Sequence, residues 1–111
     1  MSYSNKFQIL CNDLYTGHSN ADIRKHNRAM DKILKLVETI KTETDKTYML
    51  DLISSPEPRV RLSASVNCLR MGIYIQEATE ELKRIEKSNV IFEIKWDAYM
   101  SLKLFNEGKL L

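Results

Sequence analysis

The stretch that decides the fold is Ser54-Ser-Pro-Glu-Pro-Arg-Val-Arg-Leu-Ser-Ala-Ser-Val-Asn-Cys-Leu-Arg-Met-Gly72. Pro58 suits the first turn of a helix, where its missing N–H removes no hydrogen bond. Gly72 suits the left-handed conformation that often follows a last helical turn. A helix over 58–71 would carry small or apolar side chains on more than one face: Val60, Leu62, Ala64, Val66, Cys68 and Leu69. Such a helix packs between neighbours, so we expect a central helix here.

The rest of the chain predicts further helices and no strand. Apolar residues recur at steps of three and four, and only three glycines and two prolines interrupt the chain. The expected helices cover residues 4–16, 20–42, 45–53, 73–87 and 90–106. We expect the apolar stripe of the second to comprise Ile23, Met30, Ile33, Leu34, Val37 and Ile40. The inward side chains of the last should be Ile91, Ile94, Ala98, Leu102 and Phe105, with Trp96 beside them in the core.

Two helix pairs show a degenerate repeat. The pair ending at Gly72 and the pair ending near Phe105 overlay at an offset of roughly 32 to 34 residues, which is typical of helical-pair solenoids. Leu69 then falls near Leu102. The expected fold is a single all-α domain over residues 1–111. We expect a short right-handed α-α superhelix with an added N-terminal helix pair.

Within the first pair, the residues Pro56-Glu-Pro-Arg-Val-Arg61, followed by Ala64 and Leu69, resemble the core of a HEAT repeat. In that motif a proline-bearing turn precedes a Val-Arg pair and a small residue. The second pair, at Ser88-Asn-Val-Ile-Phe-Glu93, keeps the hydrophobic spacing but has neither the proline nor the Val-Arg pair. The resemblance implies HEAT-like helix pairs.

A wider pattern covers most of the chain in order. It begins at Gly17 and joins His26-Asn-Arg-Ala-Met-Asp-Lys-Ile33, Pro56-Glu-Pro-Arg-Val-Arg-Leu62 and Trp96-Asp-Ala-Tyr-Met-Ser-Leu102. This pattern resembles the bacterial family called domain of unknown function 2019. The resemblance implies a HEAT-like array and supplies no catalytic residue. Small arrays of this kind also resemble some immunity proteins of bacterial toxin systems, which is an analogy at the level of fold class.

Composition narrows the function classes. The formal charge is +2, from 17 basic and 15 acidic residues with interspersed signs, whereas nucleic-acid binders usually concentrate basic residues on one face. No apolar run approaches the ~20 residues of a membrane span, and the N-terminus has no apolar signal core, so we expect a cytoplasmic protein. Cys11 and Cys68 form no metal or redox motif and should be buried, reduced thiols.

No residue pattern predicts a catalytic, metal or cofactor site. His18 and His26 are eight residues apart, which does not match the i, i+4 spacing of a helical zinc pair. We interpret Ser63 and Ser65 as small packing residues, and we expect Arg61 to bridge neighbouring helix pairs through a carboxylate such as Asp51. One acidic cluster consists of Glu77, Glu80 and Glu81. We interpret it as a solvent-exposed helix face.

The expected function is a non-enzymatic protein–protein interaction module with an unidentified partner. It could be a toxin-neutralising or regulatory protein, with a second copy of the chain as another partner. The candidate partner-binding residues are Arg59, Arg70, Tyr74 and Tyr99, because arginine and tyrosine are frequent in interface hot spots. The alternative is a nucleic-acid-binding array with a basic face of Arg59, Arg61, Arg70, Lys83, Arg84 and Lys87. A third hypothesis, an enzyme resembling the HEAT-like DNA glycosylases, is disfavoured because this chain is short.

Overall fold

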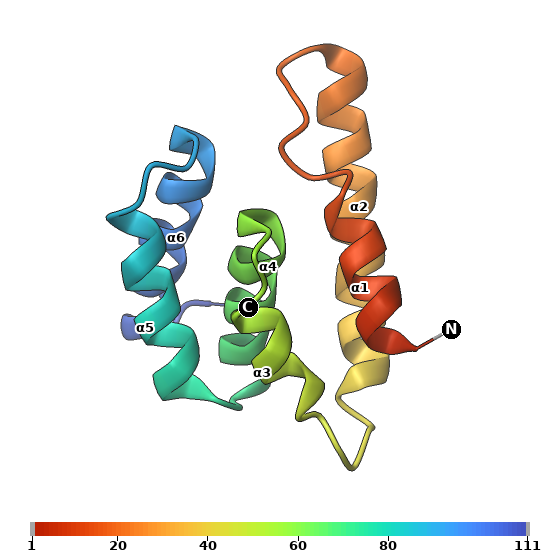
Figure 1. Ribbon diagram of the computed structural model, residues 1–111, viewed down its shortest axis with the longest axis vertical. Helices are drawn as coiled ribbons and strands as arrows, with labels where there is room; N and C mark the ends of the chain where they lie inside the picture. The colour runs from red at the N-terminus through yellow and green to blue at the C-terminus, as the bar shows by residue number, and fades with distance from the viewer. Residues whose placement is uncertain (1, 111) are drawn as a thin grey trace.

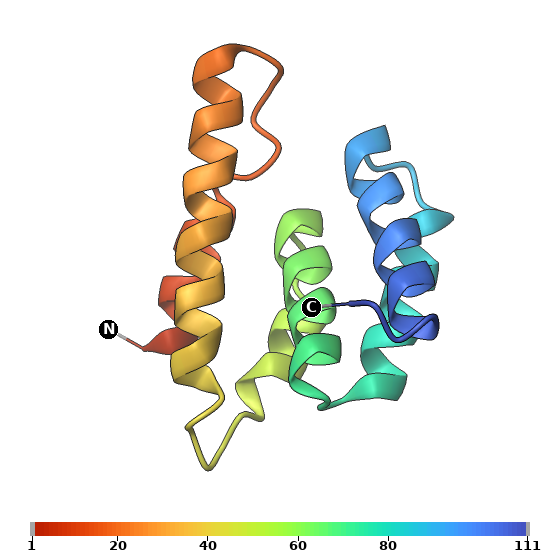
Figure 2. The same cartoon turned by 180° about the vertical axis from the view of Figure 1, so that it is seen from behind.

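The chain forms six α-helices, and the computed structural model describes residues 2–110. The helices are α1 (Tyr3–Cys11), α2 (Asn20–Ile40), α3 (Tyr48–Ile53), α4 (Pro58–Met71), α5 (Ile75–Glu86) and α6 (Phe92–Asn106). No strand occurs within the described residues. In Figures 1 and 2, α2, α4 and α6 run in one direction and α1, α3 and α5 run in the opposite direction. The all-α prediction is confirmed.

The central position of α4 follows from its sequence. Pro58 is its first residue, and Gly72 ends it with a left-handed φ of 71°, as predicted. The helix contacts α1, α3, α5 and α6, and nine of its residues are buried: Val60, Leu62, Ser63, Ala64, Ser65, Val66, Asn67, Cys68 and Leu69. Ser63 and Ser65 are therefore packing residues, as predicted. Their small side chains allow the neighbouring helices to approach α4 closely.

The long helix α2 stands partly away from the core. Ser19 caps its N-terminus: the Ser19 hydroxyl accepts from the Asp22 N–H, and the Asp22 carboxylate accepts from the Ser19 N–H. Its buried residues begin only at Ala29. Ile23 and Leu34, expected on the inward stripe, are exposed. The stripe prediction was wrong at both positions. The start of α2, which carries Ile23, projects beyond its neighbours (Figure 1), and Leu34 lies about 100° around the helix from the buried Ile33.

Several helices are shorter than predicted, and α1 differs most from its expected range of 4–16. Its helical hydrogen bonds end near Asn12, whose N–H still donates to the Ile9 carbonyl. The Arg59 guanidinium donates hydrogen bonds to the Asn12 and Leu14 carbonyls, which receive no bonds from a continuing helix. Leu14, expected within the helix, is instead a buried residue of the following loop.

Membrane-spanning segments are not found: no helix among residues 2–110 is both long and apolar enough to cross a bilayer.

The two cysteines are buried free thiols, as predicted. Burial raises the pKa of both Cys11 and Cys68 to about 12. Unfolded thiols release their protons at lower pH, so the unfolded state binds fewer protons and the free energy of unfolding falls as pH rises. We expect a loss of about 2 kcal/mol from the two thiols by about pH 9.5.

Urea unfolding across a pH series measures this effect. A Cys11→Ala/Cys68→Ala double variant is the control, because it removes the thiols and keeps the other titrating groups. Its free energy of unfolding should fall less steeply above about pH 8 than that of the unmodified protein. Equal slopes would contradict the assignment of this pH dependence to the buried thiols.

Candidate partner-binding groove

A groove of about 560 Å³ lies between the N-terminal part of α6, the loop of residues 12–19 and the start of α2. It is formed where α2 projects beyond its packing neighbours. The lining residues are Tyr15, Thr16, Gly17, His18, Ile23, His26, Ile91, Phe92, Glu93, Trp96 and Asp97. A second groove of about 250 Å³ shares Tyr15 and Asp97 with the first and extends along α4 and α6. The two grooves therefore meet at the Tyr15–Asp97 contact.

Tyr15 connects the two sides of the groove. Its hydroxyl donates a hydrogen bond to Asp97 Oδ2 on α6, and its backbone N–H donates to His26 Nδ1 on α2 at 3.2 Å. The Tyr15 and His26 rings meet edge to face, with centroids 4.7 Å apart. Tyr15 has a left-handed φ of 53°, which is uncommon for a residue with a side chain and is held here by these contacts.

Burial and the adjacent Asp97 carboxylate raise the pKa of Tyr15. The phenol therefore keeps its proton through the physiological range and remains a hydrogen-bond donor to Asp97. Since the donor and acceptor lie on the loop and on α6, this bond holds the two walls at a defined separation.

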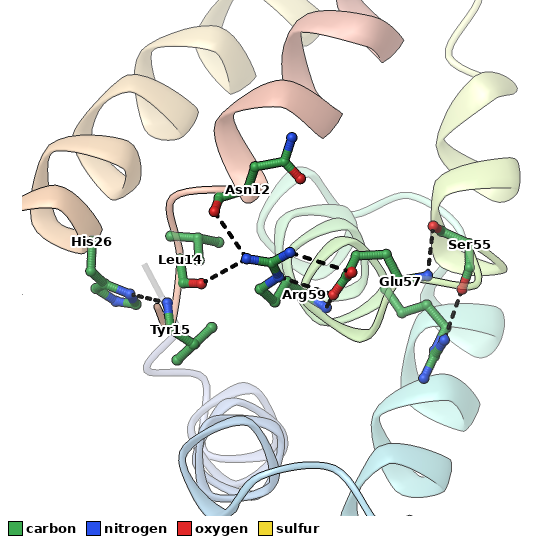
Figure 3. A network of polar contacts seen from close by, with 8 residues as sticks. Asn12, Leu14, Tyr15, His26, Ser55, Glu57 and Arg59 are labelled. Atoms are coloured by element: carbon green, nitrogen blue, oxygen red, sulfur yellow. Dashed lines mark hydrogen bonds and ion pairs between the residues drawn. The ribbon is translucent and has the colours of Figure 1, made fainter. Parts of the chain in front are cut away.

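Arg59 fixes the loop from the other side (Figure 3). Its Nη1 donates to the carbonyls of Asn12 at 2.9 Å and Leu14 at 3.3 Å, and its Nε lies 3.0 Å from Glu57 Oε1. Glu57 also caps α4 by accepting from the Arg59 N–H. Hydrogen bonds from Arg59 lower the pKa of Glu57, so this carboxylate stays ionised and holds the guanidinium in place.

Replacing Arg59 with alanine is expected to lower the free energy of unfolding by about 1–3 kcal/mol, because two loop carbonyls and Glu57 lose their partner. Lys83→Ala is the matched control. Lys83 is an exposed basic residue on α5, and its removal should change stability by under about 0.5 kcal/mol. Denaturant titration compares the two variants, and equal losses would contradict the anchoring role of Arg59.

An exposed aromatic stripe, which we call the α6 ridge, borders the groove. It consists of Phe92, Trp96 and Tyr99, of which 68%, 49% and 45% of the surface is exposed. The ring centroids of Phe92 and Trp96 are 6.1 Å apart, and those of Trp96 and Tyr99 are 5.5 Å apart. Contiguous exposed rings of this kind mark interaction surfaces more often than single exposed apolar residues do.

The prediction that Trp96 lies in the core was wrong. The buried stripe of α6 is Ile94, Ala98 and Leu102, at steps of four residues. Trp96 is two residues from Ile94 and from Ala98, which places it about 200° around the helix from each. Ile91, expected to face inward, is also exposed because it precedes the first turn of α6.

The four candidate partner-binding residues do not form one surface. Tyr99 lies on the α6 ridge, whereas Tyr74 is half-buried in the α4–α5 connection with a φ of 48°. Arg59 holds the loop of residues 12–19. Arg70 lines the second groove, and its Nη1 donates to Asn67 Oδ1 at 3.0 Å. Burial lowers the pKa of Arg70.

Arg61 joins helix pairs through a different carboxylate than expected. Its Nε lies 3.2 Å from Glu81 Oε2 on α5, and its Nη1 donates to the Ser55 carbonyl. The prediction of a solvated Glu81 was wrong, since only 7% of its surface is exposed. It pairs with Arg61 of α4 and with Arg84, which lies three residues further along α5. Glu77 and Glu80 are exposed, as expected.

Asp22, four residues before His26 on α2, accepts hydrogen bonds from Ser19 and Thr16, and these bonds lower the pKa of Asp22. His26 lies in the groove wall, and no local spacing indicates this position. Within residues 2–110, no group of three or more His, Cys, Asp or Glu side chains is placed to hold a metal ion.

Comparisons with protein-family models, with curated proteins and with solved structures find no match to this chain.

Proposed function

We propose that this chain is a non-enzymatic module that binds a protein partner through the α6 ridge and the adjoining groove. The observation that carries the proposal is that Phe92, Trp96 and Tyr99 are exposed and adjacent. The ring of Trp96 contacts the rings of both Phe92 and Tyr99. Burying such rings against a partner removes a large apolar area from water without ordering many rotatable bonds. The adjacent groove provides the concave surface into which a partner residue can insert.

We further propose that the six helices correspond to a HEAT-like array with an added N-terminal helix pair. Support comes from the alternating helix directions and from the Pro58 start and Gly72 end of the central helix. The motif at residues 56–61, and the resemblance to domain of unknown function 2019, agree with this proposal. In such an array α5 and α6 form the pair that follows α3 and α4.

Within the class of binding modules, we propose a toxin-neutralising or regulatory role. A protein that covers the active or binding surface of a partner needs a complementary shape and sufficient affinity, and it needs no catalytic group. The groove and ridge offer one aromatic surface for this purpose, positioned on a helix and braced by Tyr15 and Arg59. A fixed surface loses little conformational entropy on binding, which favours tight association.

The alternative, nucleic-acid binding by a basic face, has less support. Three of its six residues are in ion pairs within the chain: Arg59 with Glu57, and Arg61 and Arg84 with Glu81. Such pairing reduces the positive charge that is available to neutralise phosphates. Lys83 and Lys87 remain exposed on and after α5. This is a narrow basic surface compared with the stripe that a nucleic-acid binder usually presents.

Affinity capture from a lysate of the source cells tests the proposal. The tagged protein is used with and without nuclease, at low and raised salt, and bound material is identified by mass spectrometry and nucleic-acid staining. A protein that remains after nuclease treatment and raised salt is the expected result. Recovery of nucleic acid alone, lost at raised salt, would contradict the proposal and favour the alternative.

A further inference from the structure

The groove between α2 and α6 combines two carboxylates with aromatic faces. Glu93 and Asp97 lie one turn apart on α6 and both line the groove. No lysine or arginine among residues 2–110 lines it. Among the same residues, Glu93 forms no ion pair. The carboxylates that do form ion pairs are those of Glu38, Glu57, Glu81 and Glu107. The groove therefore presents two carboxylates with no lysine or arginine of the described residues in its walls.

Asp97 keeps hydrogen-bonding capacity despite its contact with Tyr15. The Tyr15 hydroxyl uses Oδ2, and a carboxylate has two oxygens with about four acceptor sites. Because Tyr15 is the donor, the Asp97 carboxylate is the acceptor of this bond. The contact fixes the orientation of Asp97 and leaves its other acceptor sites for a ligand.

His26 contributes a hydrogen-bond acceptor to the wall of the groove. Its Nδ1 accepts the Tyr15 N–H at 3.2 Å. The aromatic components of the lining are Tyr15, Phe92 and Trp96. Rings of this type attract a cation over their faces, and tryptophan does so most strongly.

We infer that the groove holds the guanidinium of an arginine side chain that a protein partner inserts between Trp96 and the Glu93–Asp97 carboxylates. This inference rests on the proposed binding function and specifies the partner's chemistry. A guanidinium can stack on an aromatic face and donate from its edge to carboxylates at the same time. A lysine ammonium is a strongly hydrated point charge and lacks the planar face for stacking. Arginine thus matches both components of the groove.

Selection from a phage-displayed random peptide library tests the inference. The full-length chain is the bait, and the strongest peptide is synthesised with arginine and with citrulline, its neutral isostere. We expect an arginine in the enriched sequences, and a roughly tenfold rise in Kd when citrulline or lysine replaces it. Glu93→Gln should cause a similar rise. When Glu93→Gln is tested with the citrulline peptide, the Kd should rise little further, since both changes remove the same contact.

Glu77→Gln is the matched control. Glu77 lies in the first turn of α5, as Glu93 does in the first turn of α6, so both changes remove a similar charge from a helix N-terminus. The control should leave the Kd unchanged. Thermal unfolding of both variants checks that the fold is retained.

Two results would overturn the inference and leave the proposed function standing. One is a set of enriched peptides without arginine whose binding is lost in Trp96→Ala. The other is equal binding of the arginine and citrulline peptides, again lost in Trp96→Ala. If no enriched peptide depends on Trp96, the inference fails together with the assignment of the α6 ridge as the binding surface.

Discussion

Replacing Phe7 with alanine is expected to lower the free energy of unfolding by about 3–5 kcal/mol. Phe7 is fully buried and belongs to the largest buried side chains of the core. It lies on α1, which has nine residues and is too short to be stable as an isolated helix. Packing against α2, α3 and α4 therefore maintains α1. Removing the ring leaves a cavity where these four helices meet and weakens the attachment of the N-terminal pair.

Urea unfolding followed by far-ultraviolet circular dichroism measures this loss. Ile9→Ala is the matched control on the same helix, because 53% of Ile9 is exposed. Its effect should stay below about 1 kcal/mol, since alanine also has the higher helix propensity. Equal losses in the two variants would contradict the packing of α1 on the central helix through Phe7.

Replacing Trp96 with alanine is expected to cost about 2–4 kcal/mol of binding free energy, or roughly 30-fold or more in Kd for the captured partner. Trp96 contacts both other rings of the α6 ridge and also lines the groove. Its removal takes away the central ring and the stacking face for the inserted arginine. Because half of Trp96 is already exposed, its loss should change the free energy of unfolding by about 1 kcal/mol or less.

Isothermal titration calorimetry with the purified partner measures the change, and thermal unfolding shows whether the fold is intact. Ile75→Ala serves as the control, since Ile75 is an exposed apolar residue at the start of α5, outside the ridge and the groove. It should bind as the unmodified protein does. If Trp96→Ala binds the partner with unchanged Kd, the ridge is not the binding surface.

The ends and burial of α4 were predictable because local backbone chemistry encodes them. Pro58 and Gly72 each restrict the backbone in a way that suits one end of a helix. The Ser19 cap of α2 is a similar case, because the side chain that satisfies the free N–H lies three residues away. By contrast, the carbonyl that follows α1 is bound by Arg59, 47 residues from Asn12, and no local pattern indicates this contact.

The candidate site depended on information that local patterns do not contain. Apolar side chains occur all around α6, so its periodicity could not show whether Ile94 or Trp96 faces the core. The Tyr15–Asp97 bond joins residues 82 positions apart, and it exists only because the fold brings the loop and α6 together. Of the candidate residues chosen by type, Tyr99 lies on the ridge, while Arg59 is engaged by its own chain.

The central claim is that the α6 ridge is the surface that contacts a protein partner. Site-specific photocrosslinking in the source cells tests it directly, with p-benzoylphenylalanine in place of Tyr99 on the ridge or in place of Ile9 on α1. Both residues are exposed, so neither substitution should disturb the fold. A crosslinked protein band from position 99 and none from position 9 is the predicted result. A crosslink to protein from position 9 alone, or to nucleic acid from position 99, would contradict the claim.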